Sequence, residues 1–170
     1  MKAIAIACTI ALCGLLAPAV AQAASDEQGF VTTAGQGTLM QLVLSELAAQ
    51  RAVSEPVRAY AVQAADDYRD LKTRIERSAE ATHAKIALAP SREQQQTAEE
   101  LLALIDEEFD LRFAEVVASE LDALLETFRS EYESGRDTPF KSLAAEYLPV
   151  LERRLAAANS LQARTASVAD

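Results

Sequence analysis

The chain has 170 residues, of which 50% are hydrophobic and 25% charged, with only five Gly and five Pro. This length suits one globular domain, and the shortage of turn residues argues against an all-β sandwich. The formal charge of −10 argues against nucleic-acid binding, because contacts to phosphate need clustered Lys and Arg.

The first 23 residues have the organisation of a secretory signal peptide. Met1-Lys2 gives a positive start, residues 3–20 are nearly all apolar, and residues 21–23 (Ala-Gln-Ala) provide the small residues of a cleavage site. We therefore predict that residues 1–23 are a Gram-negative-type signal peptide and that the mature protein begins at Ala24. The protein is then periplasmic or secreted, and the mature chain contains no transmembrane segment.

The apolar leader has two alternative interpretations. A retained membrane anchor is disfavoured by Pro18 and by the cleavage pattern. A lipoprotein attached through Cys13 is disfavoured because Leu12 precedes it where a small residue is expected. Cys8 and Cys13 both lie in the segment to be removed, so the mature protein has no thiol for a disulfide or a metal. Loss of Lys2 changes the formal charge to 15 basic minus 26 acidic groups, or −11.

Two amphipathic helices are predicted in the first half of the mature chain. The first covers about residues 26–52, and Gly35 and Gly37 predict fraying or a kink in its first half. The second begins with Ser54 as N-cap and Pro56 in the first turn, and is predicted to end near Ala89, before Pro90. Their apolar residues recur every three or four positions and include Phe30, Leu39, Met40, Val43, Leu44, Leu47, Val57, Ala61, Ala64, Tyr68, Leu71 and Ile75.

Two further helices are predicted in the second half. Ser91 and Gln94 match a capping box at the start of a helix that extends to about Ser134. Residues 137–139 (Asp-Thr-Pro) begin the last helix, in which Pro149 predicts a kink. Their apolar residues are Leu102, Ile105, Phe109, Phe113, Val117, Leu121, Leu124, Phe128, Tyr132, Phe140, Leu143, Ala144, Tyr147, Leu151, Leu155 and Ala158.

Four long amphipathic helices with short connections bury their apolar faces best against one another. The predicted fold is therefore all-α, a four-helix bundle over residues 24–164, followed by a frayed tail at 165–170.

Several ordered segments resemble a known family. They are Phe30 with Ala34, YAVQAADDY at 60–68, FDLRF at 109–113 and LPVLERRL at 148–155. In order and spacing they resemble the DUF4142 family of exported bacterial proteins, which are often labelled outer membrane proteins. The resemblance covers residues 26–161 and implies a ferritin-like four-helix bundle, with association to the outer membrane as a further implication of the label.

The sequence departs from the family at its recurrent histidine positions. The resemblance places these histidines at Tyr68, Leu121 and Arg154, and a common family glutamate at Gln41. Tyr68 and Leu121 also lie on the apolar faces of their helices. Tyr68 and Leu121 are thus predicted to serve packing rather than metal ligation, and Asp67 keeps the acidic residue that precedes the first histidine position.

Few residues indicate a metal site. Ferritin-like di-iron sites use a Glu-x-x-His motif on each of two helices, and this chain has one match, Glu80 to His83, near a helix end. We interpret His83 as a solvated surface residue. Asp67, Glu115 and Glu120 are weak candidates for a carboxylate-only site for a divalent metal, because hard cations prefer oxygen ligands.

The family positions also support an ion-pair hypothesis. If these helix faces converge, Arg154 can bridge Asp67, Glu120 or both; the alternative is that Arg154 extends to water. The densest acidic groups are residues 66–67, 106–108 and 110. They could bind a hard cation such as Mg²⁺ or Ca²⁺, or serve acid–base chemistry, but most are interpreted as solvated. The four tyrosines are interpreted as core residues with a hydroxyl at the rim.

No catalytic motif or cofactor-binding motif is recognised in the sequence. The predicted function is a non-catalytic binding or structural module whose acidic surface favours a protein or cationic partner. The alternative is a metal-binding ferritin-like protein with a carboxylate-dominated site. A third possibility is a helical partner protein that oligomerises through an exposed apolar strip; the sequence does not determine the oligomeric state.

Overall fold

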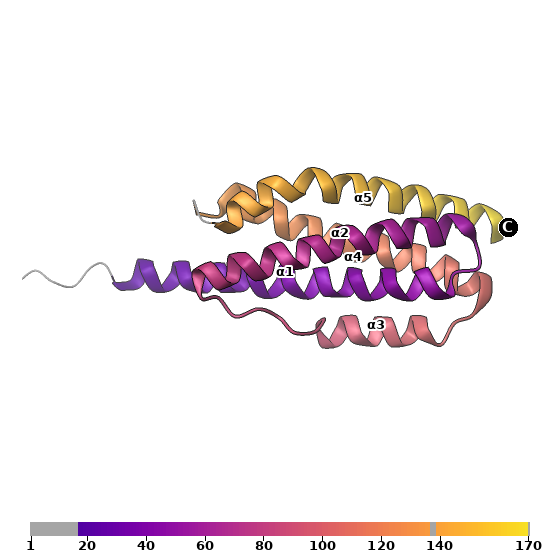
Figure 1. The fold of residues 1–170 in the computed structure, drawn as a ribbon, viewed down its shortest axis with the longest axis horizontal. Coiled ribbons are helices and arrows are strands. Elements are labelled where there is room, and N and C mark those ends of the chain that lie inside the picture. Colours follow the sequence, from indigo (N-terminus) through magenta and orange to yellow (C-terminus); the bar gives the residue numbers. More distant parts are fainter. Residues whose placement is uncertain (1–16, 137–138, 170) are drawn as a thin grey trace, which may run out of the picture.

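The computed structural model describes residues 17–136 and 139–169, and their regular structure is entirely helical (Figure 1). The helices are α1 (Ala17–Arg51), α2 (Glu55–Thr82), α3 (Arg92–Leu102), α4 (Asp106–Ser134) and α5 (Pro139–Ala169). These ranges contain no β-strand, which confirms the all-α prediction. Most of the predicted signal peptide, and the predicted cap residues Asp137 and Thr138, lie outside them.

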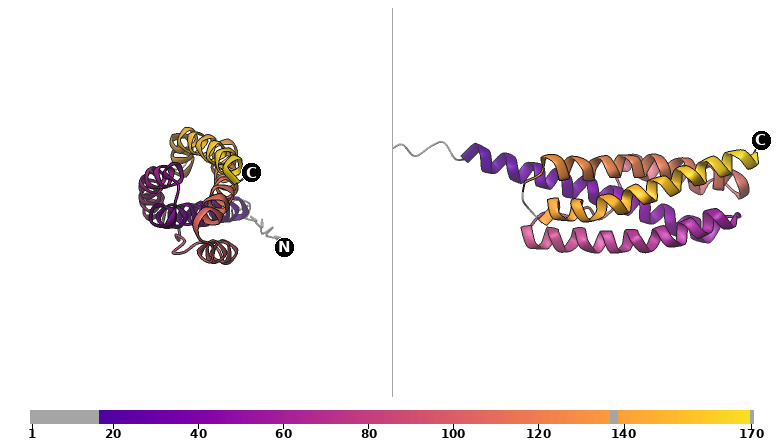
Figure 2. Two further views of the ribbon diagram at one scale, coloured as in Figure 1. Left: turned by 90° about the vertical axis from the view of Figure 1, so that its right-hand side faces the viewer. Right: turned by 90° about the horizontal axis from the view of Figure 1, so that it is seen from above.

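The four long helices α1, α2, α4 and α5 lie side by side, as the view along their axes shows (Figure 2). Helix α1 packs against α2 and α4, and α5 packs against α4 and α2. The shorter α3 lies outside this group, against α1 and α4. Each long helix therefore buries its apolar face against two neighbours.

Helix α1 is continuous through Gly35 and Gly37, where the sequence predicted a frayed or kinked segment. Both glycines are buried. A Cβ atom at position 37 would lie 3.0 Å from Leu124 Cδ1 on α4, and one at position 35 would lie 3.4 Å from the Cβ of Ala87. The missing side chains thus allow α4 and the segment after α2 to approach the α1 backbone closely.

Helix α2 ends at Thr82, so the predicted end near Ala89 is wrong. His83 adopts a left-handed conformation, with φ 59°, and ends the helix. The chain then crosses α1, where the Gln28 amide hydrogen-bonds both backbone groups of Lys85. Gln28 Nε2 donates to the Lys85 carbonyl at 2.8 Å, and the Lys85 N–H donates to Gln28 Oε1 at 2.9 Å. These hydrogen bonds to α1 replace the bonds within α2 that the sequence pattern predicted for this segment.

The predicted third helix is two helices. Its start is as predicted, because Gln94 N–H donates to Ser91 Oγ at 3.2 Å and Ser91 N–H donates to Gln94 Oε1 at 2.9 Å. Residues 103–105 interrupt it, and Asp106 begins α4 with a positive φ of 53°.

A contact from α1 accompanies the interruption. The Arg51 guanidinium donates to the carbonyls of Leu102 at 2.8 Å and Leu104 at 3.0 Å, which are thus satisfied from outside the helix. The chain reverses here, and α3 folds back along α1. Leu102 and Ile105, predicted to be on the buried face, are therefore exposed.

Helix α5 begins at Pro139, as predicted. Proline has no backbone N–H, and at the first position of a helix that N–H would have no intrahelical partner. It is continuous past Pro149, whose ring is exposed. It extends to Ala169, so residues 165–169, which the sequence placed in a frayed tail, are helical in the structure.

The core is built mainly from the predicted apolar faces, and aromatic rings fill it at two levels. The Phe30 ring contacts those of Phe128 and Phe140, with centroid distances of 5.3 and 5.7 Å. Tyr60 and Phe109 both contact Phe113 at 6.2 Å. Val43 and Tyr132, predicted to be on buried faces, are exposed.

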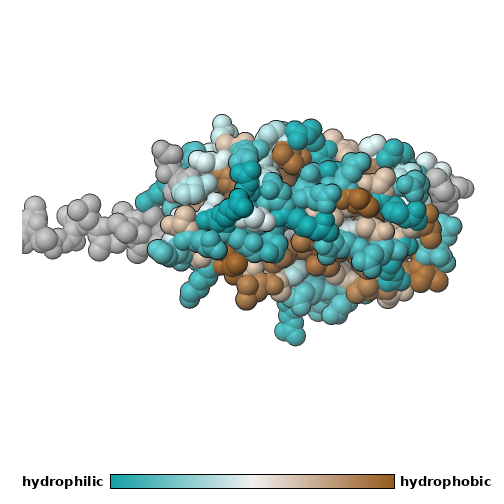
Figure 3. Space-filling model, viewed as in Figure 1, coloured by the Kyte–Doolittle hydropathy of each residue, from teal (hydrophilic) through white to brown (hydrophobic). Residues whose placement is uncertain are grey.

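The face of the molecule in Figure 3 is mainly hydrophilic, with scattered apolar residues. None of the described helices combines the length and the apolar character that crossing a membrane requires.

Candidate functional site

An ion pair joins α2 to α5 at two of the positions singled out in the sequence. Arg154 Nε lies 2.5 Å from Asp67 Oδ2, and Arg154 Nη2 donates to the Gln63 carbonyl at 3.1 Å. The Arg154 side chain is 16% exposed and that of Asp67 is 38% exposed. The guanidinium is therefore largely enclosed, with its charge met by a carboxylate and a carbonyl.

Two tyrosines of α2 lie beside this ion pair. Burial raises the pKa of Tyr60 to about 12, and the nearby Arg154 guanidinium partly offsets the effect of burial. Burial also raises the pKa of Tyr68 well above its usual range, with Tyr60 adding to it. Both phenols are therefore neutral at physiological pH, and Tyr68, at one former histidine position, is a core residue.

A surface groove between α2 and α5 borders the cluster. Its volume is ≈ 550 Å³, and its lining includes Tyr60, Gln63, Arg154, Ser160 and Arg164. Arg154 and Tyr60 thus both border the groove.

Glu120 and Glu115 have partners elsewhere. Glu120 Oε2 accepts a hydrogen bond from Gln94 Nε2 of α3 at 2.8 Å, and Glu115 pairs with Arg112 on the same helix at 3.1 Å. The structure thus joins Arg154 to Asp67, while Glu120 bonds α3 instead. In the described part of the chain, no group of three or more His, Cys, Asp or Glu side chains is placed to hold a metal ion.

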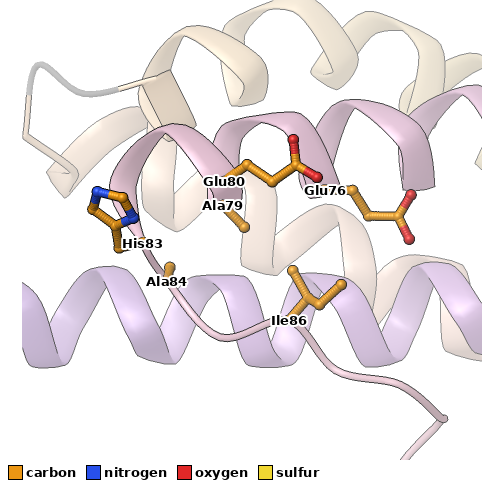
Figure 4. Close-up of a pocket in the computed structure, with 6 residues that line it drawn as sticks. All are labelled: Glu76, Ala79, Glu80, His83, Ala84 and Ile86. Atoms are coloured by element: carbon orange, nitrogen blue, oxygen red, sulfur yellow. The ribbon is translucent and has the colours of Figure 1, made fainter.

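The Glu80–His83 motif lies at the end of α2, beside a surface pocket of ≈ 650 Å³ (Figure 4). The imidazole and the Glu80 carboxylate point in different directions in this view. Glu76, which also lines the pocket, pairs with Lys72 at 2.5 Å. His83 is exposed, in line with the interpretation of a surface histidine.

Sequence reasoning missed the role of Asp110, which is only 3% exposed. Its carboxylate on α4 accepts hydrogen bonds from the backbone N–H groups of Val53 at 3.2 Å and Ser54 at 2.7 Å. Ser54 occupies the predicted N-cap position of α2, but its own side chain makes no capping bond. The helical spacing of Asp110 from Phe113 and Val117 could have indicated that this carboxylate faces inward.

The polar residues buried on α1 were also missed. Thr38, Gln41 and Ser45 are fully buried, and Gln41 Nε2 donates to the Val117 carbonyl of α4 at 3.1 Å. They lie three and four residues apart and so share one face of α1. Gln41 stands at the common glutamate position implied by the resemblance, and here it connects α1 to α4.

A second polar contact between α2 and α5 joins the Tyr147 hydroxyl to the Asp70 carboxylate. Burial, followed by the hydrogen bond to Asp70, raises the pKa of Tyr147 above its usual range. Arg74 lies nearby and pairs with Glu146 of α5 at 3.4 Å. These contacts hold the two helices together and bring no additional reactive group to the Asp67–Arg154 pair.

Comparison with known proteins identifies a family for this chain. No curated protein and no solved structure matches it. The model of a family described as a domain of unknown function, DUF4142, matches residues 15–161. The match spans most of the 170 residues and all or part of every helix. The chain belongs to the DUF4142 family.

Proposed function

We propose that this DUF4142 protein is an exported, non-catalytic helical protein that acts as a binding or structural module in the periplasm. The observation that carries the proposal is the bond between Arg154 and Asp67, whose atoms Nε and Oδ2 lie 2.5 Å apart. Asp67 is the acidic residue that the resemblance places beside a histidine position. In this chain its carboxylate is neutralised by another side chain.

The guanidinium disfavours a cation at this position for two reasons. A divalent ion at Asp67 must displace a charge-assisted hydrogen bond, and it must then lie near the positive charge of Arg154. The guanidinium cannot lose its proton to relieve the repulsion. Asp67 is therefore better suited to joining α2 and α5 than to ligating a metal.

The arrangement of the helices supports a ferritin-like four-helix bundle as the scaffold. The pairs α1–α2, α1–α4, α2–α5 and α4–α5 all pack together, which closes a ring of four. Helix α3 is an addition to this ring. An experimental structure that showed a different set of helix pairs would contradict the assignment.

Charge supports a cationic or basic partner. Acidic residues number 26 against 16 Lys and Arg, so the surface favours positively charged ligands. The test is binding of the mature protein to a fluorescent oligolysine and to an oligoglutamate of equal length. Salt-sensitive binding to the oligolysine alone is expected, and equal binding to both peptides would contradict the charge argument.

Export is tested by fractionating cells that express the full chain. We expect the protein in the periplasmic fraction with Ala24 as its first residue. A cytoplasmic protein that keeps residues 1–23 would contradict the localisation.

Metal content tests the non-metal function. The protein is expressed in medium that contains iron, manganese and zinc, purified without chelator, and analysed by elemental mass spectrometry. We expect no stoichiometric metal. A stoichiometric ion that is lost in Asp67→Ala and kept in the neighbouring control Asp66→Ala would overturn the proposal and favour a carboxylate-dominated metal site.

A further inference from the structure

Three polar side chains face the protein interior from α1. Thr38, Gln41 and Ser45 are all fully buried, but Thr38 Oγ1, Gln41 Oε1 and Ser45 Oγ have no hydrogen-bond partner among the described residues. The hydroxyls of Tyr60 and Tyr68 on the adjacent α2 are also buried, but these two tyrosines lie close enough to interact with each other. Buried polar atoms are nearly always paired in folded proteins, so this concentration on one face of α1 needs an explanation.

The usual local solution for a helical hydroxyl is not used here. Thr32 on α1 and Thr127 on α4 donate to the carbonyl four residues earlier, at 2.8 and 3.0 Å. Thr38 and Ser45 make no such bond. Gln41 Nε2 donates a hydrogen bond to the Val117 carbonyl, whereas Gln41 Oε1 remains, within the described part of the chain, an unpaired acceptor in the interior. The three oxygens thus require a partner that can both donate and accept.

A cavity of suitable size lies at one end of this set. Thr38 lines a space of ≈ 20 Å³ together with Lys72 and Glu76 of α2. A water molecule needs a space of about 10–15 Å³ and two or more polar partners. The cavity meets the size requirement, and Thr38 supplies a polar partner at its wall.

We propose that α1 carries an internal water-binding site formed by Thr38, Gln41 and Ser45. Water is both donor and acceptor, so it can satisfy the two hydroxyls and the amide oxygen. Thr38 and Ser45 lie seven residues apart, about 10.5 Å along α1, so more than one water molecule is needed. The site lies on the buried face of α1 and is separate from the groove beside Arg154. The interior of this protein is then partly polar and hydrated, and not only an apolar core.

Oxygen-17 magnetic relaxation dispersion tests the proposal on the folded mature protein, because it counts waters held longer than the protein takes to tumble. We expect long-lived waters in the wild type and fewer of them in Thr38→Val and in Ser45→Ala. Thr127→Val is the matched control, since its hydroxyl already has a backbone partner; it is expected to keep the wild-type count.

Two results would overturn the proposal. One is a wild-type protein without long-lived water. The other is a count that neither α1 variant lowers relative to Thr127→Val. If Thr38→Val does not fold, as judged by circular dichroism, Ser45→Ala and Gln41→Leu decide between the outcomes.

Discussion

The Asp110 carboxylate of α4 accepts a hydrogen bond from the backbone N–H of Ser54 at 2.7 Å, and so caps α2 from a different helix. The N–H of Val53 donates to the other carboxylate oxygen at 3.2 Å. A buried acidic side chain thereby fixes where α2 begins relative to α4. Negative charge near a helix amino terminus is also favourable because of the helix dipole.

Removing this interhelical cap should destabilise the protein. Asp110→Ala leaves two backbone donors without their acceptor, and we expect the free energy of unfolding to fall by about 2–3 kcal/mol. Urea denaturation followed by circular dichroism measures this change. The control is Asp122→Ala, at an exposed position of α4, which should change stability by less than about 0.5 kcal/mol. Equal effects of the two variants would contradict the capping role.

The Asp67–Arg154 pair should show energetic coupling in a double-mutant cycle. Arg154→Ala leaves the Asp67 carboxylate without its partner, whereas the double variant with Asp67→Ala removes both charges. We expect a coupling energy of about 1 kcal/mol, because the pair is only partly shielded from solvent. The exposed Arg153→Ala is the matched control and should show no coupling to Asp67→Ala. A coupling near zero in both cycles would mean that the contact does not hold α2 to α5.

The glycines of α1 should respond oppositely to alanine. At Gly29, a Cβ atom would have no neighbour within 4 Å, so Gly29→Ala should stabilise the helix by up to about 1 kcal/mol. At Gly37 the new Cβ would lie 3.0 Å from Leu124 Cδ1, and overpacking should cancel or exceed this gain. Thermal unfolding of the two variants measures the difference. If Gly37→Ala were as stable as Gly29→Ala, the close approach of α1 and α4 would be disproved.

Glu131 on α4 should make stability depend on pH. Burial, followed by the nearby charge of Glu27, raises its pKa above the usual 4.5. The folded state therefore favours the neutral form, and this contribution is fully present below pH 4.5 and lost as the pH rises through the higher folded-state pKa. Glu131→Gln should then unfold at a higher urea concentration than wild type at pH 7, and at a similar one below pH 4.5.

Glu133→Gln is the control for this prediction, because Glu133 is an exposed carboxylate of the same helix. It should not reproduce the pH-dependent gain. A gain of the same size at pH 4 and pH 7 in Glu131→Gln would show that the effect does not come from ionisation.

The fold was largely predictable because helical periodicity is a strong signal. Phe113, Val117, Leu121 and Leu124 on α4 were placed correctly on the buried face by their spacing alone. The break before Asp106 was not predictable, since the surrounding residues contain neither Gly nor Pro. It depends on tertiary contacts, notably the hydrogen bonds from Arg51 to the carbonyls of Leu102 and Leu104.

The candidate site was predictable only through positions implied by the family resemblance. Those positions single out Asp67 and Arg154 from the sequence alone. They did not anticipate that Glu120 bonds Gln94, because that bond requires α3 to fold back beside α4. The interpretation of Asp110 as a solvated acid is wrong, although its spacing from Phe113 and Val117 places it on the apolar face of α4.

Thermal unfolding of the mature protein with and without added metal tests the central claim most directly, namely that Arg154 serves as the partner of Asp67 in place of a metal. A ligand that binds only the folded state raises the unfolding temperature, by an amount that grows with the logarithm of its concentration relative to its Kd. The account predicts the same Tm with chelator as with manganese, iron(II) or zinc. A Tm that rises with one of these ions in wild type and in Asp66→Ala, but not in Asp67→Ala, would contradict it.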